Sequence, residues 1–338
     1  MTVIPYYRQR VTRSGQAAAS AAAGALLWGT LGPVAALFGT GDRIAAGGIR
    51  LAIGALVLLA VAKGRPLRGM ARGGRAVDAG PPAAGGQPAQ SGAGRVAPWS
   101  RTDLRPLAGG AVGIAGFQIA YFGAITSAGV AVSTAVGIGL SPVFTGLWTA
   151  IRDRRQPNAG WIVGTAVAVG GLCLLAFATT SVTFSLAGLG LSVLAAAFFS
   201  LQAVSIQELT QRHDDATALT GIFALGAVLM TPVIIGTATA KLLTPQGIAG
   251  IAYLGVVTTG MSYWLFARGI RHIGAAAAVT ITLLEPAAAA VIAALLLHET
   301  LSTGQWAGIV LIGVAITITG RTSRSTAEPE LSSAAAGS

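Results

Sequence analysis

Apolar residues are grouped in long runs along this chain, and short polar segments separate one run from the next. Ten of these runs are about long enough to cross a bilayer as an α-helix, which takes roughly 20 residues. The predicted helices are residues 17–39, 44–62, 107–128, 131–151, 159–179, 184–206, 217–238, 247–269, 274–297 and 303–319. The pattern predicts an all-α integral membrane protein with ten transmembrane helices.

The composition agrees with a membrane protein. Of the 338 residues, 53% are hydrophobic and 10% are charged, and the mean hydropathy is +0.71. A soluble domain does not need so many long apolar runs. The net charge of +11 could indicate nucleic-acid binding. The basic residues instead flank the apolar runs, where they orient membrane helices, so we expect contact with the lipid bilayer and none with nucleic acid.

The positions of the basic residues predict the orientation of the helices. With the N-terminus in the cytoplasm, the exterior loops would contain only Arg43 and Lys241 of the 22 lysines and arginines, and Arg50 would lie inside a helix. Cytoplasmic loops are enriched in Lys and Arg. We therefore predict a multi-pass protein of the plasma membrane with both termini in the cytoplasm.

Two of the segments outside the apolar runs have the composition of unstructured polypeptide. Residues 63–106 are rich in Gly, Ala, Pro and Arg, which predicts a disordered basic linker. A solvated linker is favoured over one bound to anionic lipid headgroups. Residues 1–16 are predicted to be a cytoplasmic N-terminus, and residues 320–338 a disordered cytoplasmic tail.

One carboxylate, Glu285, lies near the centre of the apolar run 274–297, and Pro286 follows it directly. It is about eleven residues from Gly274, or roughly 16 Å along a helix. A carboxylate at that depth costs several kcal/mol unless it is protonated, paired or hydrated, and the proline loosens the preceding turn. Glu285 is a candidate proton carrier, partner for a substrate ammonium group, or gate. The alternative is a packing acid bonded to a neighbouring Ser or Tyr.

The two halves of the chain resemble each other. Residues 131–175 align with 275–319, so that Ser141 and Pro142 fall on Glu285 and Pro286. Each half would contain five helices, at 17–179 and 184–319. Because five is odd, the halves would be inverted relative to each other, which is a transporter architecture.

Other polar and aromatic residues could complete a pocket with Glu285. Gln118 and Tyr121 are three residues apart and share a helix face. Thr259, Ser262 and Tyr263 share another. The full candidate set for substrate binding or gating is Glu285, Pro286, Tyr263, Ser262, Thr282, Gln118, Tyr121, Ser141, Trp28, Arg50 and Gln202. For each one alone, interhelical hydrogen bonding or packing is the competing interpretation.

Arg50 has two interpretations that the sequence leaves equally open. It lies about six residues into its helix, roughly 9 Å deep, and an arginine can snorkel that far to the interface. It could instead bind an anionic group or pair with an acid.

Metal and cofactor chemistry is not expected. The three histidines, His213, His272 and His298, are far apart in sequence, and Cys173 is the only cysteine. Small-residue pairs such as Gly304 and Gly308 favour helix packing, with a homodimer as the alternative.

Several motifs together resemble a known family. They are Leu26–Thr30 (LLWGT), Arg50, Ser141–Pro142, Ala267–Gly274 after Tyr263, and His298–Thr300 after the Leu-Leu-Glu-Pro segment. In their order and spacing, the chain is similar to the drug/metabolite transporter superfamily of the EamA type. The resemblance implies a bacterial plasma-membrane protein with two five-helix repeats around a central cavity that exports small metabolites or drugs, often amino acids. The chain departs from the family pattern at Asp153–Arg155 and in its long linker.

The sequence analysis therefore predicts a secondary transporter that exports small amphiphilic metabolites, amino acids or related compounds, or drugs, by alternating access. Protons are a candidate coupling ion, and uncoupled diffusion is equally open. No Walker motif indicates direct use of ATP. The alternatives are an importer of a nutrient or nucleotide-sugar, an intramembrane lipid-modifying enzyme, and a non-transporting scaffold. The enzyme would need clustered acids with a metal, or a nucleophile with a buried histidine.

Overall fold

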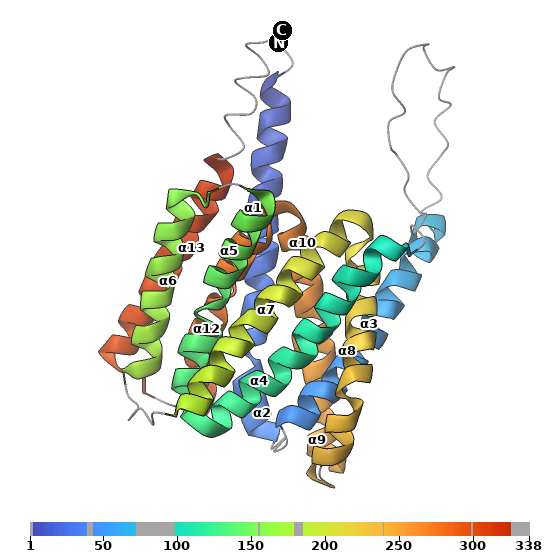
Figure 1. The fold of residues 1–338 in the computed structure, drawn as a ribbon, viewed down its shortest axis with the longest axis vertical. Helices are drawn as coiled ribbons and strands as arrows, with labels where there is room; N and C mark the ends of the chain where they lie inside the picture. Colours follow the sequence, from blue (N-terminus) through green and yellow to red (C-terminus); the bar gives the residue numbers. More distant parts are fainter. Residues whose placement is uncertain are drawn as a thin grey trace.

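The computed structural model describes residues 3–38, 43–71, 99–154, 156–178, 185–238, 240–298 and 300–325. Within these ranges the secondary structure is entirely helical (Figure 1). The elements are α1 (Val3–Gly29), α2 (Leu31–Phe38), α3 (Arg43–Ala71), η1 (Arg101–Asp103), α4 (Leu104–Gly137), α5 (Ser141–Asp153), α6 (Ala159–Phe177), α7 (Leu186–Arg212), α8 (Asp215–Thr237), η2 (Ala240–Leu243), α9 (Pro245–Tyr253), η3 (Leu254–Met261), α10 (Ser262–Ile273), α11 (Ala275–Ile281), α12 (Leu284–Leu297) and α13 (Thr303–Ser325).

The predicted all-α membrane fold is confirmed. In the described part of the chain, eight helices are long and apolar enough to cross a membrane, and Thr303–Thr319 is a shorter apolar helix. The 37-residue span Arg101–Gly137 bends at Gly129, whose φ of 78° and ψ of 169° are not helical. The part of α4 after this bend continues into α5, so the described helices correspond to the ten predicted ones.

Some predicted boundaries differ from the structure. Residues 63–71 continue α3, and residues 101–106 form η1 and the first turn of α4, although all were assigned to a disordered linker. In the same way, α1 begins within the predicted N-terminal segment and α13 continues past residue 320. Helices extend beyond the apolar runs because their first and last turns can be polar where they leave the membrane. The rest of the predicted linker and tail, residues 72–98 and 326–338, lies outside the described residues.

Two helices are interrupted in the same way. At Pro142, the missing proline N–H is replaced by the N–H of Ser141, which donates to the Ile138 carbonyl at 3.2 Å. At Pro286, the N–H of Glu285 donates to the Thr282 carbonyl at 2.9 Å. Both are tight turns caused by a proline that cannot donate to the residue four positions back. They lie at the positions that the alignment of the two halves brings together.

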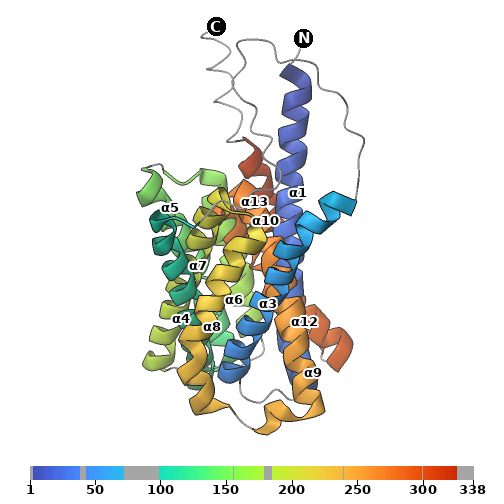
Figure 2. The same ribbon diagram turned by 90° about the vertical axis from the view of Figure 1, so that its right-hand side faces the viewer.

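The most extensive helix contacts are also related across the two halves (Figures 1 and 2). They join α4 to α7, α1 to α10, α3 to α8, and α6 to α13. Each pair joins one helix of the first predicted half to one of the second. When the halves are exchanged, the pair α1–α10 becomes α7–α4, whereas α3–α8 and α6–α13 each become themselves. A two-fold relation between the halves would produce this set of pairs. The inverted repeat itself stays a prediction.

Three helix ends define one end of the bundle. The start of α1 and the ends of α3 and α13 lie together at the top of Figures 1 and 2, and α9 lies at the bottom. We call these the terminal end and the opposite end.

Glycines bring α6 and α13 into close contact. A Cβ atom on Gly171 would lie 2.8 Å from the Gly308 carbonyl oxygen, and one on Gly308 would lie 2.5 Å from that of Gly171. Gly164 packs against Thr319 and Ala315 in the same interface. These glycines pack within the chain, so they do not provide a surface for the homodimer that small-residue pairs left open.

Substituting Gly171 with alanine should therefore destabilise the protein. The Gly171→Ala methyl group would meet backbone atoms that must move, at a cost of about 1–3 kcal/mol. Gly170→Ala is the matched control, because nothing lies within 4 Å of its Cβ position. Thermal unfolding of the purified chain in detergent should show a lower melting temperature for Gly171→Ala only. Equal melting temperatures would contradict this packing.

Candidate functional site: a central cavity between the two halves

A cavity of about 760 Å³ lies in the centre of the bundle. This volume falls within the range of roughly 300–1,000 Å³ that is typical of small-molecule sites. Its deep part is lined by Trp28, Arg50, Ser141, Tyr263 and Glu285, and its outer part by residues at helix ends, including Ala35, Ala46, Val130, Ala176 and Gln305. These outer residues all belong to the opposite end, so the cavity extends from the middle of the bundle toward that end.

Most of the candidate residues come together in this cavity. Its walls include Glu285, Pro286, Tyr263, Gln118, Tyr121, Ser141, Trp28 and Arg50. The other three, Ser262, Thr282 and Gln202, are buried but do not line it. The Ser262 hydroxyl donates to the Thr258 carbonyl, and the Thr282 hydroxyl donates to the Val279 carbonyl at 2.7 Å. Both hydroxyls thus bond within their own helical segment and not between helices, and the two side chains are packed in the interior.

Arg50 lies inside the bundle and does not snorkel to the interface. Its exposed fraction is 7%, and its Nη2 donates to Oε1 of Gln118 at 3.1 Å. Its Nε and Nη1 atoms and the Nε2 atom of Gln118 have no hydrogen-bond partner among the described residues. Three N–H donor atoms are thus left unpaired at the wall of the cavity.

Glu285 lies in the first turn of α12 and lines the same cavity. Its carboxylate has no hydrogen-bond or ion-pair partner among the described residues, although its charge acts on Arg50. Gly29 allows α1 to pack against this turn, because a Cβ atom there would lie 2.9 Å from the Glu285 carbonyl oxygen. The packing alternative, an acid bonded to a neighbouring Ser or Tyr, does not describe this side chain.

Aromatic rings form much of the remaining wall. Trp28 makes an edge contact with Tyr263 at 4.7 Å between ring centroids, and it also contacts Phe199. Phe117 stacks on Tyr121 at 5.1 Å. Such rings provide large apolar contact area with specific geometry. A charged centre beside aromatic walls can accommodate a small amphiphile.

The cavity residues that the sequence analysis did not single out include Phe117, Phe122, Thr134 and Gln305. Phe117 and Phe122 flank the Gln118–Tyr121 face and could have been found by extending that stripe. Thr134 lies after the Gly129 bend, where its hydroxyl is 2.9 Å from the Tyr121 hydroxyl. Gln305 lies near the start of α13, and no local signal in the sequence marks it.

Ionic contacts connect the two halves at the terminal end. The Asp103 carboxylate is paired with Arg212 at 3.0 Å and with the Nε2 atom of His213 at 3.1 Å. Arg152 pairs with Glu208 at 3.3 Å. Asp103 and Arg152 belong to the first predicted half, whereas Arg212, His213 and Glu208 belong to the second. These contacts hold the ends of α4 and α5 against α7.

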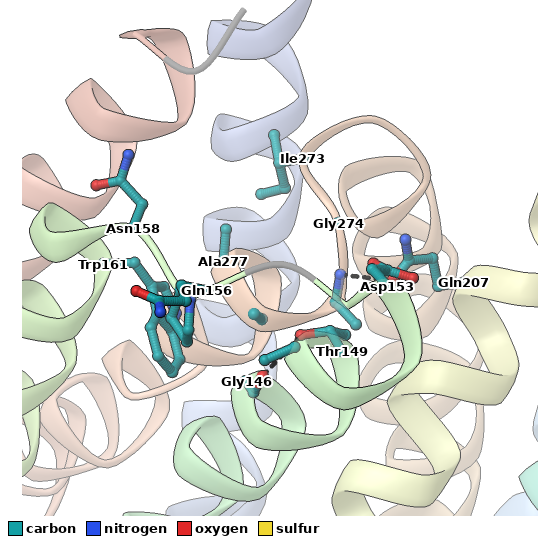
Figure 3. A pocket seen from close by; sticks show the side chains of 14 residues that line it. Gly146, Thr149, Asp153, Gln156, Asn158, Trp161, Gln207, Ile273, Gly274 and Ala277 are labelled. Carbon is teal, nitrogen blue, oxygen red and sulfur yellow. Dashed lines mark hydrogen bonds between the residues drawn. The ribbon is translucent and has the colours of Figure 1, made fainter.

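A second, smaller cavity of about 260 Å³ lies at the terminal end (Figure 3). Polar side chains from α5, the loop after it and α7 line it, namely Thr149, Asp153, Gln156, Asn158 and Gln207. A Cβ atom on Gly146 would lie 2.0 Å from the Trp161 ring, so α5 and α6 are in close contact here.

Buried residues separate the two cavities. The α5, α6 and α11–α12 segments line both cavities, each with a different part of its length. Between these parts lie Thr145 on α5, Thr165 on α6 and Thr280 on α11. Trp161 Nε1 donates to the Thr280 hydroxyl at 3.1 Å, and the hydroxyls of Thr165 and Thr280 are 3.2 Å apart. A hydrogen-bonded layer that includes Trp161, Thr165 and Thr280 thus lies between the central cavity and the smaller cavity at the terminal end.

Three comparisons with known proteins agree with this architecture. Residues 186–321 match the model of the EamA-like transporter family. A protein of Bacillus subtilis (strain 168), described as uncharacterized transporter YwfM, is 30% identical over 210 residues, which are 62% of this chain and 70% of the relative. A crystal structure of a protein 16% identical to this chain superposes with a TM-score of 0.70 and covers 92% of this chain and 99% of its own, which supports the fold alone. The chain therefore belongs to the EamA-like transporters of the drug/metabolite transporter superfamily, and it is a membrane transporter.

Proposed function

We propose that this protein is a secondary transporter that exports small amphiphilic metabolites, amino acids or related compounds, or drugs, by alternating access. The observation that carries the proposal is one central cavity, which extends to one end of the bundle and is closed at the other. A single site between two halves can face either side when the halves rock against each other.

The closed end has contacts that a conformational cycle can break. Arg152 and Arg212, which contribute to the ion pairs there, are 49% and 41% exposed. An exposed ion pair contributes only about 0–1 kcal/mol. Opening this end would therefore cost little at the Arg152–Glu208 pair and more at the Arg212–Asp103 pair, because the Asp103 side chain is only 3% exposed.

We assign the terminal end to the cytoplasm. Arg152, Arg212 and Arg271 lie there, whereas Arg43 and Lys241 are at the opposite end, in agreement with the enrichment of basic residues in cytoplasmic segments. Both termini are then cytoplasmic, the membrane is the bacterial plasma membrane, and the structure represents an outward-facing state.

The cavity favours a small amphiphile over a nucleotide-sugar. Aromatic rings form much of its wall, and Arg50 is the one cation among the described residues that line it. A diphosphate bridge carries two negative charges and would need more cationic partners. A substrate with at most one anionic group and an apolar body matches these walls better.

We propose that protons drive the export through Glu285. Its carboxylate faces the cavity without a partner among the described residues, and a carboxylate in such a place is a common proton relay in transporters. In each cycle, Glu285 would bind a proton in one of the two conformations, outward-facing or inward-facing, and release it in the other.

The Glu285→Gln substitution should abolish transport that is driven by a pH gradient, because an amide cannot exchange a proton. Substrate flux in proteoliposomes is expected to fall to the level of empty liposomes, while size-exclusion chromatography shows a folded protein. Asp153→Asn is the control, because it removes an exposed carboxylate outside the central cavity. Unchanged flux of Glu285→Gln at several pH values would contradict the role of Glu285.

Transport itself is tested with the full chain in proteoliposomes, using amino acids and amphiphilic drugs with and without an imposed pH gradient. We expect the gradient to accelerate flux of at least one amphiphile in the direction that corresponds to export. Flux that equilibrates regardless of the gradient would indicate a facilitator, and flux in the opposite direction an importer.

Weakening the terminal end should shift the protein away from the outward-facing state. Asp103→Asn removes the charge that pairs with Arg212, and we expect the ratio of outward-facing to inward-facing molecules to fall about tenfold. The measurement uses Ala290→Cys, a position in the cavity wall, in a Cys173→Ala background. Labelling from outside by a membrane-impermeant thiol reagent should become slower.

Asp153→Asn is again the control, because this residue has no ion-pair partner among the described residues. An unchanged labelling rate for Asp103→Asn would show that the ionic contacts do not keep the terminal end closed.

A further inference from the structure

We propose that Arg50 and Gln118 form a binding site for a carboxylate group of the transported molecule at the deep end of the central cavity. The inference rests on the proposed function, because it assigns a chemical class to the substrate of that cavity. It makes Arg50 the residue that recognises the charge of the substrate.

The unpaired donors have the right kind and number for a carboxylate. Nε and Nη1 of Arg50 and Nε2 of Gln118 have no acceptor among the described residues, while Nη2 of Arg50 is bonded to Gln118. Arg50 is 7% exposed and Gln118 is 1% exposed. Leaving such groups unpaired in a buried place is costly. A carboxylate accepts two parallel N–H bonds from one guanidinium, here one from Nε or Nη1 and one from the second N–H of Nη2, which is the strong and specific geometry for this pair.

None of the described residues supplies this acceptor. The charges that act on Arg50 come from Glu285 on α12 and, when it is ionised, Tyr263 on α10. Neither forms an ion pair or hydrogen bond with Arg50 among the described residues. Glu285 therefore offsets part of the charge of Arg50 through space, and the buried Nε and Nη1 atoms of Arg50 have no acceptor among the described residues.

Gly47 contributes to the position of Gln118. It lies one turn before Arg50 on α3 and lines the cavity. A Cβ atom at this position would lie 2.7 Å from Nε2 of Gln118, so an alanine would displace the amide. Gly47→Ala thus disturbs the site without removing any charge.

The surrounding walls define the rest of the ligand. The rings of Phe117 and Tyr121 flank Gln118 on α4, and Trp28 and Tyr263 line the deep part of the cavity. An aromatic or aliphatic body would contact these rings while its carboxylate binds Arg50. The expected class is a monocarboxylate with an apolar body, with or without an ammonium group that could face Glu285.

The test compares probes of similar shape and different charge. The full chain, purified in detergent, is titrated with 3-phenylpropionate, which has a carboxylate, and with phenethylamine, which has an ammonium group instead. Binding is measured by isothermal calorimetry. The variants are Arg50→Gln, Arg50→Lys and Gly47→Ala, and the control is Arg268→Gln, which removes an exposed arginine outside the cavity.

We expect 3-phenylpropionate to bind the wild-type protein more tightly than phenethylamine does. Arg50→Gln should weaken 3-phenylpropionate binding about ten- to a hundredfold, as expected for a charge-assisted bond. Arg50→Lys keeps the charge but not the two parallel donors, so its affinity should be intermediate, and Gly47→Ala should weaken the carboxylate probe selectively. Arg268→Gln should bind both probes as the wild type does.

A structural role for Arg50 would give a different result. Arg50→Gln would then lower the melting temperature and weaken both probes equally, and this outcome would overturn the proposal. Tighter binding of phenethylamine than of 3-phenylpropionate to the wild type would also overturn it. In that case the cavity would still bind an amphiphile, so the proposed transport function would stand while its substrate class changed.

Discussion

A backbone group without a hydrogen-bond partner inside a membrane is costly, and this constraint shapes the centre of the molecule. Pro142 and Pro286 each remove a donor where two helices pass through the middle of the bundle. The tight turns recover one bond each, and the Ser141 carbonyl accepts two more from the hydroxyls of Thr145 and Ser200 at 2.7 and 2.9 Å. Each interrupted helix thereby brings one polar residue, Ser141 or Glu285, to the cavity wall. The position of the cavity follows from these two breaks.

The contacts around the cavity differ in how easily they can be separated. Glycines bring backbones together between α6 and α13, and also between α1 and α12 at Gly29. Such contacts are lost only when whole helices separate, because dispersion and close packing hold membrane helices together. At the terminal end, the halves are joined by partly exposed ion pairs and a few hydroxyl bonds. The molecule thus combines tightly packed helix pairs with weaker contacts at one end, which the proposed alternating access would have to break.

Much of the fold could be predicted from the sequence. The length of an apolar run shows whether a helix can span a bilayer, and the basic residues beside it indicate the orientation of that helix. The breaks at Pro142 and Pro286 were visible for the same reason, since a proline has a definite local effect. The residues that line the cavity were harder to predict. Thr282 shares the helical run of Glu285, yet its hydroxyl bonds to Val279, and Gln305 reaches the cavity from a helix end that has no local signal. Which face of a helix meets the cavity depends on its rotation, and that depends on neighbours far away in the chain.

The opposite charges in the cavity connect substrate and proton in the proposed mechanism. Arg50 and Glu285 line one cavity without direct contact, and each offsets part of the charge of the other. A carboxylate that binds Arg50 neutralises the charge that faces Glu285. Two carboxylates would then share one cation, and an uncompensated buried charge is costly. A proton on Glu285, or the ammonium group of a zwitterionic substrate beside it, removes that cost. The same pair of residues can therefore both select an anionic group and link its binding to the arrival of a positive charge.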